Sequence, residues 1–138
     1  FGLTISAVVL VGASAAFGMV LWRLPLGLLA LLFSTMAFSA LGALVSVSVN
    51  EVFEAQTLAN AIRFPMIFLC GVFLPLEALP GILPTVARLL PLTYAVEALD
   101  IALVQGSVAA MGLDLAALAI FTIALFAVAT AILRQRLD

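Results

Sequence analysis

Runs of uncharged, mostly apolar residues constrain the fold of this chain more than any other feature. One run covers residues 3–22, a second covers residues 26–49, and a third makes up most of residues 113–133. A helix rises 1.5 Å per residue, so about 20 residues cross the roughly 30 Å of hydrocarbon in a bilayer. A transmembrane barrel would show segments of about ten residues with alternating polarity instead. The pattern therefore predicts an all-α, polytopic membrane protein.

Composition supports this class and excludes several functions. The chain is 67% hydrophobic and 9% charged, against about 45–50% and about 25% in soluble domains. Five arginines and no lysines cannot form a basic patch for nucleic acid. The chain has no histidine, a single cysteine at Cys70 and no GxxxxGK[ST] phosphate loop. We therefore expect no catalytic site, no metal site and no internal disulfide.

The third predicted span covers residues 57–75, and its start is unusually polar. Fully apolar sequence lasts only from residue 64 to residue 74, which is too short to cross a bilayer. The helix must therefore begin among polar residues. Gln56, Asn60 and Arg63 then share one stripe, because they are spaced at i, i+4 and i+7. Arg63 either snorkels to the head groups or faces a wet interior.

Prolines break the segment that follows. Five of them lie between residues 64 and 100, where a helix interior tolerates none without losing a hydrogen bond. We predict a re-entrant or interfacial hairpin over residues 79–104, with one short helix over residues 80–90 and another over residues 93–104. Irregular backbone of this kind must be buried in protein or face water. The five prolines are Pro65, Pro75, Pro80, Pro84 and Pro91.

The second hairpin helix is predicted to be amphipathic. Its polar row contains Thr93, Glu97 and Asp100, and its apolar row contains Leu92, Val96, Leu99 and Leu103. Glu97 and Asp100 are either paired carboxylates that could bind a cation or, as we favour, one wetted helix face. Tyr94 is expected at the level of the head groups.

The order of motifs in this region resembles that of type-2 ATP-binding-cassette (ABC) exporter permeases. The resemblance rests on Asn60 and Pro65, GVFLP at residues 71–75, Glu77, the Leu79-Pro80 pair and PLTYAVEAL at residues 91–99. The family usually has arginine where this chain has Asp100, which leaves any charge pairing at that position open.

The resemblance implies a subunit of six spans, of which this chain would supply the last four. The chain begins without an initiator methionine and without a signal peptide, so we expect it to be the C-terminal portion of a longer protein. Two permease copies, identical or paired, would form the pathway in the cytoplasmic membrane, surrounded by lipid. A separate ABC ATPase would bind ATP and Mg, so this chain would bind no cofactor and would not be an enzyme. The candidate translocation and gating residues of the hairpin are Gly71, Pro75, Glu77, Pro80, Pro91, Tyr94, Glu97 and Asp100.

The sequence therefore predicts an exporter of amphipathic cargo such as drugs, lipids or glycolipids. Its rivals are an ion-coupled secondary transporter, in which Arg63 or the acids would carry the coupling, and a non-transporting scaffold. Arginines at both ends give a weak preference for a cytoplasmic C-terminus, since Arg134, Arg136 and a snorkelling Arg63 outnumber Arg23 and Arg88.

Overall fold

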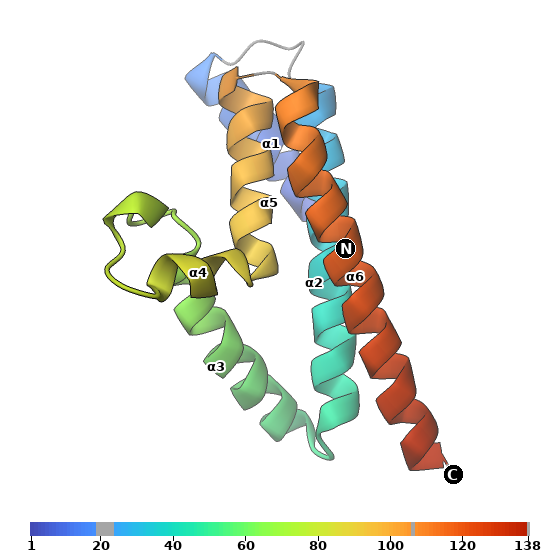
Figure 1. Cartoon of the computed structure of the whole chain (residues 1–138). Helices are drawn as coiled ribbons and strands as arrows, with labels where there is room; N and C mark the ends of the chain where they lie inside the picture. Colours follow the sequence, from blue (N-terminus) through green and yellow to red (C-terminus); the bar gives the residue numbers. More distant parts are fainter. Residues whose placement is uncertain (19–23, 106, 138) are drawn as a thin grey trace.

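The computed structural model describes residues 1–18, 24–105 and 107–137, and every regular element among them is a helix (Figure 1). This agrees with the predicted all-α class. The end of the apolar run over residues 3–22, and Arg23 after it, lie outside the described residues. The elements in chain order are α1 (Gly2–Phe17), α2 (Leu24–Ser48), α3 (Val52–Leu69), the 3₁₀ turn η2 (Leu76–Ala78), α4 (Leu83–Arg88), α5 (Pro91–Asp100), the π-helical turn η3 (Ile101–Gln105) and α6 (Val108–Leu137).

The two longest helices form the spine of the molecule. α2 and α6 pack against each other, and both run from the same end of the molecule to the other (Figure 1). Both are long and apolar enough to cross a membrane. Among the described residues they are the two helices that meet this criterion, while α1 contributes a shorter apolar helix over Gly2–Ala13. The four spans predicted from the sequence therefore remain a prediction at α1 and α3.

α5 packs against both α2 and α6, beside the upper part of the spine in Figure 1. Its contacts are made by alanines, because Ala98 of α5 and Ala102 of the following η3 join Ala30 and Met111 in one buried cluster. Ala95 packs with Ala37 and Leu118 in a second cluster nearer the middle of the spine. Small side chains let helix backbones approach closely. In a membrane such close packing drives helices together, because lipid is as apolar as the side chains and burial from water contributes little.

This alanine row corrects the predicted faces of the second hairpin helix. The leucine and valine row is only half-buried, and the alanines form the buried face. Thr93, which was predicted on the polar row, is fully buried. Asp100 is exposed, as expected for a wetted position. A large apolar side chain has nearly the same free energy facing lipid as facing protein, so hydrophobicity alone does not identify the buried side of a membrane helix.

Several boundaries differ from those predicted. α3 begins at Val52 rather than near residue 57 and ends at Leu69, and α6 begins at Val108 rather than near residue 113. The first hairpin helix starts at Leu83 with Pro84 in its first turn, not at Pro80. Gly81 follows Pro80 with a φ of +64°, so the chain turns there. No side chain caps the first N–H groups of α3, and the Glu54 carboxylate in its first turn accepts a hydrogen bond from the Asn50 backbone N–H just before the helix over 3.4 Å.

Candidate functional site: a proline-broken hairpin and a groove

Glycine and proline shape the hairpin between α3 and α5. Gly71 has a φ of +89°, in the left-handed region that favours glycine. Pro75 immediately precedes η2, and Pro91 lies in the first turn of α5, where its missing N–H leaves no bond unmade. The predicted shaping residues thus lie at the breaks between elements. Pro65 is an exception, because α3 continues through it to Leu69.

A buried hydrogen bond joins the two hairpin helices. The Thr93 hydroxyl of α5 donates to the Ala87 carbonyl of α4 over 2.6 Å, and both residues are fully buried. The same carbonyl, in the last turn of α4, also accepts the Leu90 backbone N–H over 3.1 Å. Thr93 therefore fixes the angle between α4 and α5. The sequence analysis placed Thr93 on the polar row and did not foresee this contact.

Two carboxyl groups meet between α5 and α6. The Glu97 carboxyl group lies next to that of Asp114, which is 7% exposed. Burial and the Asp114 carboxylate raise the pKa of Glu97, and the Arg88 guanidinium of α4 opposes them. The carboxyl group beside Glu97 is thus that of Asp114 and not that of Asp100, with which the sequence suggested a pair. Seventeen positions separate Glu97 and Asp114 in the sequence, and no periodicity signals their contact.

The other predicted site residues are dispersed. Tyr94 is half-buried, and its ring lies 5.8 Å from the Phe121 ring of α6. Glu77, Pro75 and Pro80 are exposed on the loop. The polar stripe of the third helix, Gln56, Asn60 and Arg63, is exposed along α3 and forms no part of the groove described next.

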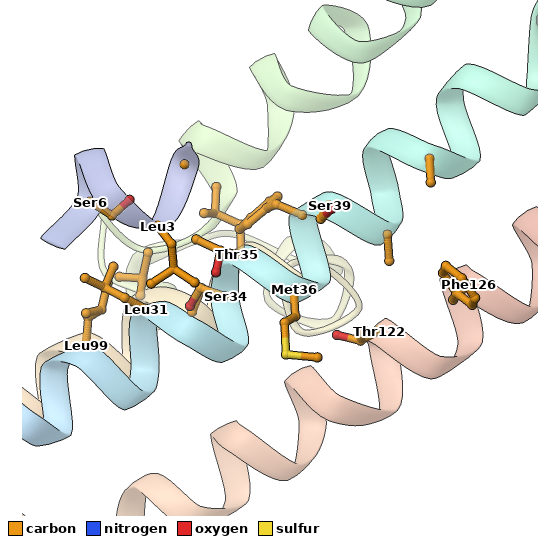
Figure 2. Close-up of a pocket in the computed structure, with 17 residues that line it drawn as sticks. Leu3, Ser6, Leu31, Ser34, Thr35, Met36, Ser39, Leu99, Thr122 and Phe126 are labelled. Carbon is orange, nitrogen blue, oxygen red and sulfur yellow. The ribbon is translucent and has the colours of Figure 1, made fainter.

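An open groove of about 880 Å³ lies against α2 and is bounded by α1, α5 and α6. Figure 2 shows Leu3 and Ser6 of α1 on one side of α2, and Met36 pointing toward Thr122 of α6 on the other. α5 contributes four lining residues, among them Leu99. None of the individually predicted site residues lines the groove. The hairpin contributes to it only through the apolar side of α5.

The groove carries hydroxyl groups but no charged side chain. Ser34 donates to the Ala30 carbonyl over 2.7 Å, Thr35 to Leu32 over 2.9 Å and Thr122 to Leu118 over 2.8 Å. In each bond the hydroxyl donates its proton to a carbonyl of its own helix, so toward the groove the hydroxyl oxygen can act only as a weak hydrogen-bond acceptor. The groove therefore presents an uncharged, mostly apolar surface.

Arg136 is a further residue whose contacts the sequence did not reveal. The sequence analysis counts it only among the arginines that favour a cytoplasmic C-terminus. Its guanidinium reaches across from α6 to the turn between α2 and α3. There it donates to the Asn50 side-chain oxygen over 2.7 Å, and to the carbonyls of Val49 and Ser48 over 3.3 Å each.

Comparison with known proteins places these features in a family. Residues 1–104 match the family model described as ABC-2 type transporter. Nodulation protein J from Rhizobium leguminosarum bv. trifolii is 31% identical over 128 residues, which is 90% of this chain and 48% of that protein. Nodulation protein J of R. leguminosarum bv. viciae is 31% identical over 105 residues, 74% of this chain and 39% of that protein. The Rhizobium meliloti (strain 1021) protein of the same name is 34% identical over 73 residues, 53% of this chain.

This chain spans less than half the length of these curated relatives. No solved structure matches it. The family match covers the first three helices and the whole hairpin, which are the elements that carry the resemblance seen in the sequence. The chain belongs to the ABC-2 type transporter family of membrane permeases.

Proposed function

We propose that this chain is part of the membrane-spanning subunit of an ATP-driven exporter whose cargo is amphipathic. The observation that carries the proposal is α5, a short helix held between α2 and α6 by alanine contacts and bordering an uncharged groove. In a permease of this family, a hairpin helix attached through small side chains can slide or tilt without breaking ion pairs in the groove. Cargo with an apolar part would then pass or enter without desolvating a charge.

ATP would be hydrolysed by a partner ABC ATPase with Mg, and this chain would supply only the path. Approach of two ATPase domains would rock two permease copies, identical or paired, against each other. The hairpin between residues 79 and 104 would then act as the exit gate, with its bends set by Gly71, Pro75, Pro80 and Pro91. Glu97 of the hairpin would influence the opening of the gate through its interaction with Asp114 of α6.

We further propose a topology of four spans in the cytoplasmic membrane with a cytoplasmic C-terminus. The first and third spans would be α1 with the residues that follow it, and α3 with the segment to residue 75. The Arg136 end of α6 and the turn between α2 and α3 lie together, so both would face the cytoplasm. The hairpin loop would then face the outside.

Inverted membrane vesicles test the proposal. Vesicles from cells that express the full-length protein with its ATPase would be given a fluorescent amphipathic amine or a short-chain fluorescent phospholipid. We expect accumulation that requires hydrolysable ATP and survives a protonophore. Accumulation that needs a proton gradient but no ATP would favour an ion-coupled carrier. If both probes fail while a sugar-headed lipid accumulates, the cargo class narrows to glycolipids.

A further inference from the structure

The C-terminal turn of α6 is fastened to the turn between α2 and α3 by one side chain. Arg136 spreads three hydrogen bonds over Ser48, Val49 and Asn50. Asn50 is also tied to α3, because its backbone N–H donates to the Glu54 carboxylate over 3.4 Å. The consecutive helices α2 and α3 thus meet the distant helix α6 at Asn50. We name this contact set the Arg136 clamp.

Elementary electrostatics explains why arginine occupies this position. The last carbonyls of a helix lack intrahelical partners and carry partial negative charge. α2 and α6 run in the same direction and end at the same end of the molecule (Figure 1). The Arg136 guanidinium therefore lies at the negative ends of two helix dipoles at once. Its planar fork reaches several acceptors, which the single ammonium group of lysine does less well.

We propose that Arg136 is a positioning residue for transport, which makes the end of α6 move together with the turn between α2 and α3. The transport part of this inference rests on the proposed function. A partner that pushes on the turn would move the last helix in the same step. α6 carries Leu118 and Met111, against which α5 packs, so the motion would reach the hairpin. The clamp thus gives a contiguous route from the turn to α5.

A distance measurement tests the clamp without reference to transport. Spin labels would be placed by Val52→Cys and Leu137→Cys, two sites that are 87% and 77% exposed, in the full-length protein carrying Cys70→Ala. We expect a narrow distance distribution with Arg136 intact. Arg136→Ala and Asn50→Ala should each broaden it. Arg134→Ala, which removes the neighbouring exposed arginine, is the matched control and should leave it narrow.

Arg136→Lys keeps the positive charge but replaces the planar guanidinium, with its several donors, by a single ammonium group. If the clamp depends on several directed hydrogen bonds, the lysine variant should broaden the distribution almost as much as the alanine variant. A distribution as narrow as that of the unmodified protein would show that charge alone suffices and would overturn the clamp. An unchanged width in Arg136→Ala would overturn it as well.

Transport is the second readout. In vesicles with the partner ATPase, Arg136→Ala and Asn50→Ala should each lower export per ATP hydrolysed by roughly threefold to tenfold. The double variant should be no worse than either single variant, because both remove one contact. Broadened distances with unchanged export per ATP would refute the positioning role. Absence of any ATP-dependent export in the unmodified protein would refute the proposed function and leave the distance result standing.

Discussion

At the scale of single residues, buried polar side chains settle the geometry of the hairpin. Thr93 is fully buried, and its one hydroxyl bond fastens α5 to the last turn of α4. The Ala87 carbonyl also accepts the Leu90 backbone N–H over 3.1 Å, so removing the hydroxyl costs one hydrogen bond and does not leave the carbonyl without a partner. A single substitution therefore tests whether the two helices are held at a fixed angle.

Thr93→Val should destabilise the protein by about 0.5–1.5 kcal/mol, because the valine keeps the shape and removes one donor to the Ala87 carbonyl, which retains the Leu90 N–H. The measurement is the thermal unfolding midpoint in detergent. Thr85→Val, at an exposed position in α4, is the control and should change it little. Equal midpoints for the two variants would show that the hydrogen bond contributes nothing.

Glu97 makes stability depend on pH. Burial and the Asp114 carboxylate raise its pKa, so the folded state holds the proton more tightly than the unfolded chain does. The stability from this proton is fully present below the ordinary glutamate pKa, about 4.3, and is lost as pH rises through the raised value.

Glu97→Gln, which cannot ionise, should therefore gain thermal stability relative to the unmodified protein as pH is raised from 4 to 8. Midpoints measured across this range check it, with Glu77→Gln on the exposed loop as the control. A constant difference between Glu97→Gln and the unmodified protein across the range would contradict the raised pKa of Glu97.

At the scale of elements, the alanine row of α5 governs how the hairpin docks. Ala98 is fully buried against Ala30 and Met111. Overpacking such a contact usually costs about 1–3 kcal/mol. Ala98→Leu should therefore lower the unfolding midpoint and reduce ATP-driven export, while Ala109→Leu at an exposed site of α6 should do neither. Normal export by Ala98→Leu would show that close docking of α5 is dispensable.

The sequence predicted the helical class and the broken hairpin because prolines and glycines act locally. Pro91 lies at the start of a helix because proline lacks a backbone N–H, and Gly71 lies at a turn because glycine readily adopts a positive φ. It did not predict which side of α5 is buried. Lipid and protein interior are about equally apolar, so leucine and alanine positions carry no simple burial signal.

Contacts between distant elements were also beyond the sequence analysis. Glu97 with Asp114, and Arg136 with Asn50, join residues whose separation follows no helical period. Arg136 in particular resembles any basic residue after a span. Only the parallel course of α2 and α6 brings it to the end of α2.

At the scale of the whole molecule, the account depends on which ends share a side of the membrane. A membrane-impermeant maleimide would be applied to Cys70→Ala protein carrying Val52→Cys, Leu137→Cys or Val108→Cys, all exposed sites. We expect Val52→Cys and Leu137→Cys to react only from the cytoplasm and Val108→Cys only from outside. Labelling of Val52→Cys and Val108→Cys from the same side would contradict the four-span topology.

The central claim is that this permease works with an ABC ATPase, and co-purification tests it most directly. The full-length protein would be isolated in mild detergent, and the material that accompanies it would be identified by mass and assayed for ATP hydrolysis. We predict a stoichiometric cassette ATPase whose hydrolysis is inhibited by vanadate. An intact oligomer without any ATPase would contradict the account and make Glu97, Asp114 and Arg63 the first residues to test for ion coupling.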